Sequence, residues 1–249
     1  MTANMDRPIG LVPAAGRGTR FSAFCVKELY PLPSDDGTLR PVAEHALRLV
    51  SGAGAQQCVV MVSPDKLEVL EVLSQMTEPS IDLAYVVQSQ PRGLPNAVRT
   101  AYRWIANRNV VLALPDTFVV PHDAAAQILT AQLKASADLA LGVFPVEEPE
   151  RMGPVEFGPD GTVQQVFDKP QHTSLRNSWG IASWSPAFTD FCCAWDDKQG
   201  DGPETVIGHV FDAARASGMK VIGVGFPNGV LLDIGTSNGL RRALERLSR

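Results

Sequence analysis

The stretch IGLVPAAGRGTRFSAFCVKELYP, residues 9–31, organises the rest of the chain. It begins with a short apolar run at residues 9–12 that predicts a strand. A loop of small residues follows, and it carries Arg17 and Arg20, with Lys27 further on. Glycine lets backbone N–H groups approach phosphate oxygens closely, while arginine and lysine add charge-assisted hydrogen bonds. The stretch therefore predicts a strand and an anion-binding loop, with a plain Gly-rich turn as the alternative.

This loop matches neither of two common phosphate-binding patterns. The sequence lacks the Gly-Lys-Ser/Thr that ends a Walker A loop, and Gly16-Arg17-Gly18 lacks the third glycine of a dinucleotide-binding fingerprint. Residue types alone therefore predict an anion site without naming its ligand.

Two neighbouring motifs resemble those of a known family. The residues AAGRGTRF at 14–21, followed by Lys27-Glu28-Leu29 and Pro31, resemble the signature of the sugar-phosphate nucleotidyltransferases, also called nucleotide-sugar pyrophosphorylases, and among them the glucose-1-phosphate thymidylyltransferase-like enzymes. In that family the strand and loop bind a nucleoside triphosphate, and pyrophosphate is released. The resemblance implies that Arg20 and Lys27 are catalytic residues that hold the triphosphate. It also implies that the loop binds the nucleotide through Pro13, Ala14, Ala15, Gly16, Arg17, Gly18 and Thr19.

The loop departs from part of this family in its length. The segment 19–27 is shorter than in the sugar-1-phosphate thymidylyltransferases and closer to the cytidylyltransferases that activate polyol or choline phosphates. The class of enzyme is unaffected, whereas the acceptor stays open.

Length and composition indicate a globular protein. Of the 249 residues, 45% are hydrophobic and 20% are charged, which are ordinary values for a folded protein. We expect a single domain over residues 1–249, with a nucleotide-binding half at about 8–146 and an acceptor-binding half at about 147–249. The net charge of −5 argues against a nucleic-acid partner, because an extended surface for one needs an excess of lysine and arginine.

Several other classes of protein are also disfavoured. No apolar run reaches the roughly 18 residues of a transmembrane helix and no signal-peptide core precedes the first strand, so we expect a cytoplasmic protein without a membrane partner. The four cysteines show neither zinc spacing nor the density of a disulfide scaffold. Since no residue follows Arg249, we expect no appended β-helix domain of the kind found in some relatives. The sequence leaves a homo-oligomer open.

Strand and helix patterns alternate through the first half of the chain. Apolar runs predict strands at 9–12, 58–62, 83–87, 110–114 and 139–146, and helical periodicity lies between them at 41–49, 65–75, 94–106 and 122–134. This repetition predicts a Rossmann-like three-layer αβα sandwich with a mostly parallel mixed sheet. Ligands of such α/β folds bind beyond the carboxyl ends of the strands, which is where the first loop lies.

The second half begins with strands and then becomes helical again. A hairpin at 154–167, built on the turn Pro159-Asp160-Gly161, is followed by a strand at 178–184. Helices are expected at 188–195, 204–217 and 238–247, with a strand at 220–224. We therefore predict a β-rich extension on the acceptor side of the sheet.

A polar segment after the third strand is a candidate for reading the nucleotide base. Residues 88–97, QSQPRGLPNA, resemble the family's base-recognition segment, in which Gln88 and Gly93 match best. An amide presents both a donor and an acceptor to a pyrimidine edge. The alternative is a polar loop that starts a helix at Pro95, which stands where the family usually has alanine.

Two aspartates follow apolar strands and are candidates for holding Mg²⁺. Asp116 comes directly after the strand at 110–114, and a carboxylate at that edge suits a hard cation that also binds phosphate oxygens. Asp233 lies in Leu232-Asp233-Ile234-Gly235-Thr236, which resembles the second metal aspartate of the family. The alternatives are a turn at Asp116 and a helix cap near Asp233. Together the two positions predict one shared magnesium ion.

Three motifs in the second half resemble the acceptor half of the family. They are Met152-Gly153-Pro154, Phe167-Asp168-Lys169-Pro170 and Trp179-Gly180-Ile181. The resemblance implies that Gly153 and Gly180 face the sugar, that Asp168 accepts sugar hydroxyls and that Lys169 pairs with the sugar phosphate. Family members usually have glutamate at position 168. Trp179 either stacks on a ring or packs in the core, and the apolar run that follows it favours the core.

These observations predict a magnesium-dependent nucleotidyltransferase. The enzyme would transfer a nucleoside monophosphate from a nucleoside triphosphate to a sugar 1-phosphate, release pyrophosphate and form an NDP-sugar. Two alternatives stay in view: a cytidylyltransferase for a non-sugar phosphate, and a non-catalytic regulator that binds a nucleotide or a sugar.

Overall fold

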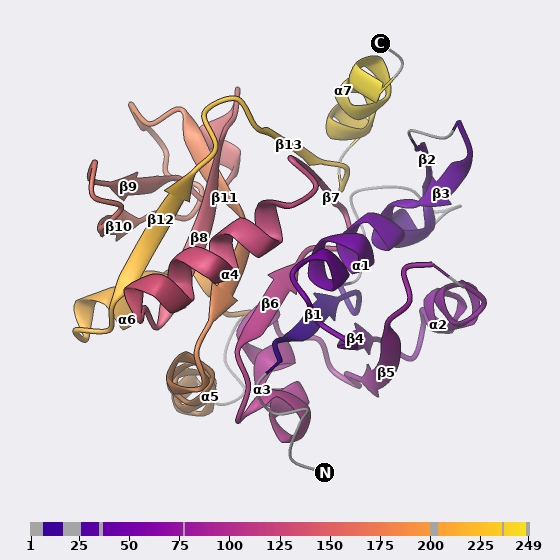
Figure 1. Ribbon diagram of the computed structural model, residues 1–249, viewed down its shortest axis with the longest axis horizontal. Helices are drawn as coiled ribbons and strands as arrows, with labels where there is room; N and C mark the ends of the chain where they lie inside the picture. The colour runs from indigo at the N-terminus through magenta and orange to yellow at the C-terminus, as the bar shows by residue number, and fades with distance from the viewer. Residues whose placement is uncertain are drawn as a thin grey trace.

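A seven-stranded sheet runs through the centre of the molecule (Figure 1). This computed structural model describes residues 7–16, 26–34, 37–76, 78–199, 204–235 and 237–247. The strands lie in the order β12 (Val221–Gly225), β8 (Leu139–Pro145), β11 (Asn177–Trp184), β6 (Val110–Ala113), β1 (Ile9–Pro13), β4 (Gln57–Val62) and β5 (Asp82–Val87). Within this sheet β11 runs antiparallel to both of its neighbours, whereas the other paired strands are parallel.

Helices cover both faces of the sheet. One apolar core joins the sheet to α3 (Leu94–Ile105), α5 (Pro186–Gln199) and α6 (Ile207–Ala216). The other core joins it to α1 (Val42–Gly52), α2 (Leu67–Ser74) and α4 (Ala124–Ala135). A strand covered on both faces has no polar side, which is why every residue of β6 is buried. The predicted three-layer sandwich with a mostly parallel mixed sheet is confirmed.

The predicted hairpin of the second half is also present. Strands β9 (Val155–Phe157) and β10 (Val163–Val166) pair antiparallel across the expected turn, in which Gly161 has a φ of +82°. The hairpin joins the edge of the main sheet, since the Gly223 N–H of β12 donates to the Gly161 carbonyl at 2.8 Å. The β-rich extension therefore lies beside β12, an edge strand of the main sheet.

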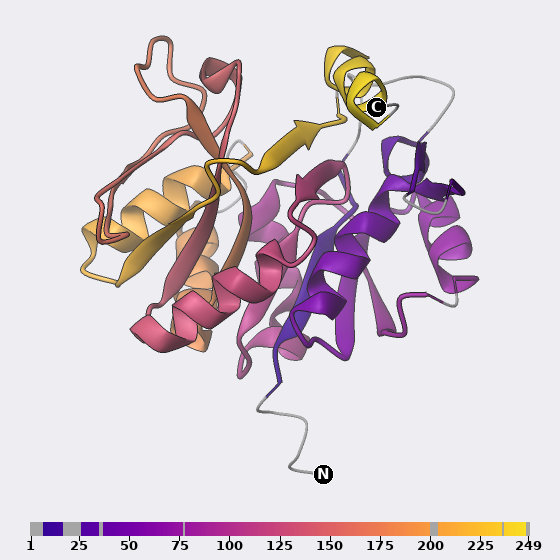
Figure 2. The same cartoon turned by 45° about the horizontal axis from the view of Figure 1, so that its top comes forward.

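A second small sheet was not predicted. Strand β7 (Thr117–Val120) pairs antiparallel with β13 (Val230–Asp233), and the register sets Asp233 opposite Thr117. After β13 the chain enters α7 (Ser237–Leu247), which packs against α1 and against the hairpin of β2 (Pro31–Pro33) and β3 (Leu39–Pro41). Figure 2 shows α7, in yellow, on the side of the sheet away from the N-terminus. Among the described helices none is long and apolar enough to cross a membrane.

Helix α1 supports β7 through a histidine. The His45 ring stacks on Phe118 with centroids 4.3 Å apart and meets His122 edge-on at 5.5 Å. Its Nε2 atom lies 3.0 Å from both the backbone N and the backbone O of Val119, so the ring bonds the strand in either tautomer. Burial, with a smaller contribution from His122 and then from Arg48, lowers the pKa of His45 to about 4.

This packing predicts a loss of stability in weak acid. The ordinary pKa of histidine is 6.5, so between pH 6.5 and about 4 the unfolded chain binds a proton that the folded chain does not. Lowering the pH from 7 to 4.5 is expected to remove about 2–3 kcal/mol of unfolding free energy through His45. Urea unfolding of the wild type and of His45→Gln at both pH values measures this share. If the unfolding free energy of His45→Gln fell with pH as much as that of the wild type, groups other than His45 would cause the loss.

Candidate active site

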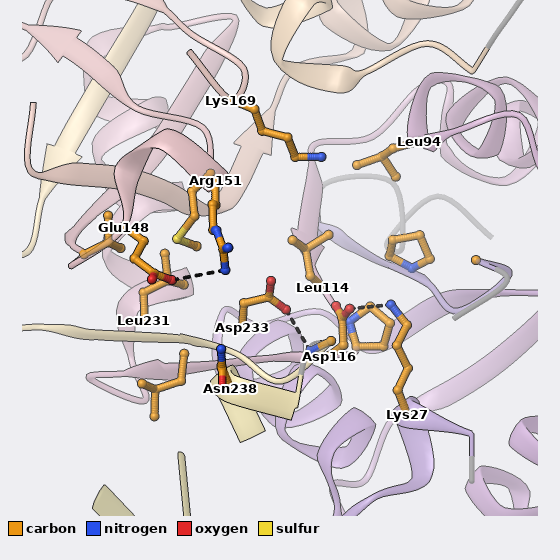
Figure 3. A pocket seen from close by; sticks show the side chains of 18 of the residues that line it. Lys27, Leu94, Leu114, Asp116, Glu148, Arg151, Lys169, Leu231, Asp233 and Asn238 are labelled. Atoms are coloured by element: carbon orange, nitrogen blue, oxygen red, sulfur yellow. Dashed lines mark hydrogen bonds and ion pairs between the residues drawn. The ribbon is translucent and has the colours of Figure 1, made fainter. Parts of the chain in front are cut away.

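A cleft of about 1800 Å³ opens at the carboxyl edge of the sheet (Figure 3). It is lined by Pro13 at the end of β1, Gln88 after β5, Asp116 after β6 and Val146 after β8. Because β11 is reversed it begins at this same edge, and Arg176, directly before it, also lines the cleft. The cleft therefore occupies the place where α/β sheets bind ligands.

Lys27, Asp116 and Asp233 meet in this cleft around Gly235. A Cβ atom added to Gly235 would lie 2.9 Å from Asp116 Oδ2, 2.9 Å from Asp233 Oδ1 and 3.8 Å from Lys27 Nζ. The two carboxylate oxygens are thus within twice 2.9 Å of each other. The Gly235 N–H donates to Asp233 Oδ1 at 2.8 Å, and the Ile234 N–H donates to the Asp116 carbonyl at 2.8 Å. The structure thus brings these three predicted site residues together, while their chemical roles stay predictions.

The Lys27 ammonium forms an ion pair with the Asp116 carboxylate, and both side chains are mostly buried. Burial alone would lower the pKa of Lys27. The charge and hydrogen bond of Asp116 outweigh it, helped by the charges of Glu28 and Asp233, and the net pKa lies above the ordinary 10.5. Lys27 is therefore a fixed positive charge at neutral pH.

A second ion pair anchors the short helix η1 (Lys27–Leu29), from which Lys27 extends. Lys66 Nζ lies 2.9 and 3.0 Å from the two Glu28 carboxylate oxygens, and the Glu28 and Lys66 side chains are only 1% and 7% exposed. Burial raises the pKa of Glu28, and the charge of Lys66 opposes this rise. Because a buried ion pair is costly to break, it holds η1 in one place beside the cleft.

The pair of aspartates suits Mg²⁺ better than a metal that needs a full protein cage. Within the described part of the chain, no group of three or more His, Cys, Asp or Glu side chains is arranged to hold a metal. Magnesium commonly takes one or two carboxylates together with substrate phosphates and water. Asp116 and Asp233, open to the cleft, are a donor set of this kind.

The candidate base-reading residues also lie in the cleft. Gln88 is 4% exposed, lines the cleft and donates from Nε2 to Asn96 Oδ1 at 2.6 Å. Gly93 precedes α3 with a φ of +93°, and an added Cβ would lie 2.3 Å from the Thr205 carbonyl oxygen. Only glycine fits there, because both the backbone conformation and the space exclude a side chain.

The loop after β1 is described in part. Pro13, Ala15 and Gly16 line the cleft, whereas Ala14 is fully buried and its N–H donates to the Met61 carbonyl at 2.8 Å. Ala14 thus ties the loop to β4. The other predicted loop residues, Arg17, Gly18, Thr19 and Arg20, lie outside the described residues.

Of the predicted acceptor residues, Lys169 lines the cleft and reaches into it (Figure 3). Asp168 is not part of the lining and lies beside Gly208 of α6, where an added Cβ would be 3.8 Å from the Asp168 Cβ. Their predicted roles in binding the acceptor stay predictions.

The other three predicted acceptor residues lie behind the cleft wall. Trp179 packs edge-on against Phe211 at 5.2 Å, in the core position that the sequence favours. A Cβ on Gly153 would lie 2.3 Å from Trp179 Nε1, and one on Gly180 would lie 2.2 Å from Leu231 Cδ1. These glycines therefore let Trp179 and Leu231 pack closely, and Leu231 itself lines the cleft.

A sequence model described as Nucleotidyl transferase matches residues 9–249. The chain belongs to the nucleotidyl transferase family. It is 28% identical over 180 residues to a glucose-1-phosphate thymidylyltransferase of Neisseria meningitidis, a match that covers 69% of this chain and 58% of that protein. It is 30% identical over 149 residues to a UTP–glucose-1-phosphate uridylyltransferase of Streptococcus pyogenes, which covers 51% of this chain and 48% of that protein. The chain thus spans about half the length of these curated relatives.

Solved structures share the fold of this nucleotidyl transferase family member. A putative glucose-1-phosphate thymidylyltransferase from Bacillus anthracis, in complex with a sucrose, superposes with a TM-score of 0.81 at 17% identity, over 96% of this chain and 95% of that one. A UDP-glucose pyrophosphorylase complexed with UDP-glucose gives 0.77 at 21% identity, over 97% and 98%. At these identities the likeness shows the fold alone.

Several residues of the nucleotidyl transferase cleft were missed by sequence reasoning. Arg242 of α7 forms ion pairs with Glu147 at 3.2 Å and Glu148 at 3.4 Å, and Glu148 also pairs with Arg151 at 3.7 Å. The amphipathic pattern predicted the helix of Arg242, but no local signal tells which loop that helix lies over. Further lining residues outside the predicted set are Glu150, Arg176, Glu204, Asn238 and Glu245.

The position of Gly93 predicts a measurable cost of adding one methyl group. Gly93→Ala is expected to lower the unfolding free energy by about 3 kcal/mol or more, from left-handed backbone strain and from collision with Thr205. Gly54→Ala is the matched control, because Gly54 has a similar φ of +89° with nothing within 4 Å of the added atom. It should cost about 1–2 kcal/mol. Equal losses in urea unfolding would show that the contact with Thr205 does not matter.

Proposed function

We propose that this protein is a nucleotidyltransferase that transfers a nucleoside monophosphate from a nucleoside triphosphate to a sugar 1-phosphate. Pyrophosphate is released and an NDP-sugar is formed. The observation that carries the proposal is the meeting of Lys27, Asp116 and Asp233 at the carboxyl edge of the sheet. Family membership and the names of the relatives support the choice of substrates.

The reaction needs no covalent bond to the protein. A phosphate oxygen of the acceptor attacks the α-phosphorus in line, a new P–O bond forms, and the bond from the α-phosphorus to the bridging oxygen breaks. The electron pair leaves with pyrophosphate. Catalysis then consists of positioning and of neutralising negative charge, which is the work of fixed cations near the triphosphate.

Four charged residues hold the triphosphate and its metal ion in this scheme. Lys27 is already a charged donor at the cleft, and it is poised to bond phosphate oxygens that enter beside Asp116. Asp116 and Asp233 would hold Mg²⁺, which when bound supplies charge neutralisation at the α-phosphate. Arg20 keeps its predicted role on the same phosphates.

Residues of the acceptor-binding half orient the sugar phosphate. Lys169 reaches into the cleft and forms no ion pair with any other described residue, so its ammonium is available to an anionic acceptor. Charge-assisted hydrogen bonds to phosphate are among the stronger ones in proteins. The cleft is large enough for a nucleotide and a sugar phosphate together.

The aspartate pair is tested by pyrophosphate release. Purified protein is assayed with UTP, dTTP, CTP, ATP and GTP against a panel of sugar 1-phosphates in the presence of Mg²⁺. Asp116→Asn and Asp233→Asn are each expected to lower kcat by about 100-fold or more, because a carboxylate that faces the reacting phosphate is lost. Asp82→Asn is the control, since Asp82 is exposed at the start of β5, on the opposite edge of the sheet. Near-normal turnover in either variant would contradict the assignment.

The acceptor site is tested by a separate substitution. Lys169→Gln keeps a polar side chain, one atom shorter, and removes its charge, so KM for the acceptor phosphate should rise about 10-fold to 100-fold. KM for the triphosphate should change little. Lys134→Gln, at an exposed position on α4, controls for the loss of one positive charge. An unchanged acceptor KM would remove Lys169 from the acceptor site.

A further inference from the structure

A chain of buried polar side chains leads from the cleft into the protein. It joins Gln88 after β5, Asn96 on α3 and Asp196 on α5. Gln88 Nε2 donates to Asn96 Oδ1 at 2.6 Å, and Asn96 Nδ2 donates to Asp196 Oδ2 at 3.1 Å. The three residues are 4%, 6% and 5% exposed, so water competes little for these bonds. Helices α3 and α5 hold the chain of bonds, since they pack together on one face of the sheet (Figure 1).

The carboxylate at the inner end gives the chain of bonds a direction. An ionised carboxylate only accepts hydrogen bonds, whereas an amide has a donor end and an acceptor end. Asn96 must therefore turn its NH₂ group to Asp196 and its carbonyl oxygen to Gln88. Gln88 must in turn present its NH₂ group to Asn96. Either amide turned around would place two acceptors or two donors against each other in a buried site, which is costly.

The consequence at the cleft is a fixed acceptor. Gln88 lines the cleft, and its Nε2 group donates one hydrogen bond to Asn96. The Gln88 Oε1 atom receives no hydrogen bond from any other residue that the structure describes. A ligand that enters here therefore meets a carbonyl oxygen whose orientation is set from within the protein.

Nucleobases differ at the position that such an oxygen would contact. Uracil and thymine carry an N–H donor at N3, whereas N3 of cytosine is an acceptor. A fixed acceptor binds the N3–H and repels the cytosine lone pair. A site built to bond one hydrogen discriminates strongly against a ligand that lacks it, because its own polar group is then left unpaired.

We infer that Asp196, acting through Asn96, fixes the Gln88 amide so that the cleft selects uracil or thymine nucleotides over cytosine nucleotides. This inference rests on the proposed function, and within it Asn96 and Asp196 are positioning residues. It also accounts for a carboxylate held in a buried site, where a hydrophobic residue would commonly be at least as stable.

The matched pair Asp196→Asn and Asp197→Asn tests this assignment. An asparagine at 196 can donate as well as accept, so both amides of the chain become free to turn. Asp197 is the neighbour of Asp196 on α5 and undergoes the same change of charge, but it pairs with the exposed Arg99 instead. Dissociation constants for UTP, dTTP and CTP are measured by calorimetry with Mg²⁺ and without acceptor, and kcat/KM values are measured by pyrophosphate release.

We expect the wild type and Asp197→Asn to bind UTP at least about tenfold more tightly than CTP. In Asp196→Asn the preference for UTP over CTP should fall severalfold. The affinity that comes from the ribose and triphosphate, which all these ligands share, should change less. A folded Asp196→Asn protein that keeps the wild-type ratio would overturn the inference. An equal loss for all triphosphates would do so too, because it indicates a merely structural role. A wild type that prefers CTP would overturn it directly.

A second variant and the choice of readout separate the possible outcomes. If Asp196→Asn does not fold, Asp196→Ser is measured instead, since a hydroxyl also donates or accepts and should narrow the ratio in the same way. Binding is read without acceptor so that the two proposals fail separately. Selective UTP binding with no pyrophosphate release for any acceptor would contradict the proposed function but not the role of Asp196.

Discussion

The pairing of β7 with β13 is the constraint on which the site depends. It brings Asp233 beside Asp116, although 117 positions separate them in the chain numbering, and the main-chain bond from Ile234 to Asp116 fixes the approach. Two carboxylates at this distance repel each other. The Lys27 ammonium offsets that repulsion, and a glycine at 235 is required because a side chain would fill the space between the oxygens.

The support for Lys27 follows from the same electrostatics. A lysine that must stay charged in a mostly buried place needs a fixed backbone, because a small shift would lose the compensating carboxylate. The Glu28–Lys66 pair provides it by tying η1 to the segment before α2. The cleft thus rests on two ion pairs of different kinds: Lys27–Asp116 faces the cleft, and Glu28–Lys66 is almost fully buried.

The sequence revealed the parts of the fold that depend on local patterns. Near-continuous apolar strands and helices with periodic apolar faces are recognisable within ten or so residues, so the sandwich, the hairpin and the placement of Gln88 and Asp116 at one edge could be predicted. Lys169 was found through the resemblance of its motif to a known family. The β7–β13 pair could not, because both strands are short and their partners are distant. Asp196 was missed for a related reason: on a helix with neighbouring charges it resembles a surface residue, and only its contact with Asn96, a hundred positions away, shows otherwise.

The reversal of β11 explains how the second half of the chain reaches the same cleft. Since β11 begins where β8 ends, Asn177 can pair its side-chain amide with the backbone N and O of Val155, at 2.9 and 3.0 Å, as a strand would. These two bonds hold β9 in place, and β10 is held in turn by its pairing with β9. The chain then turns at Lys169, whose φ is +41° and whose N–H donates to the Met152 carbonyl at 2.8 Å. The position of the Lys169 backbone is thus set by main-chain bonds, so its charge can be removed without disturbing the fold that carries it.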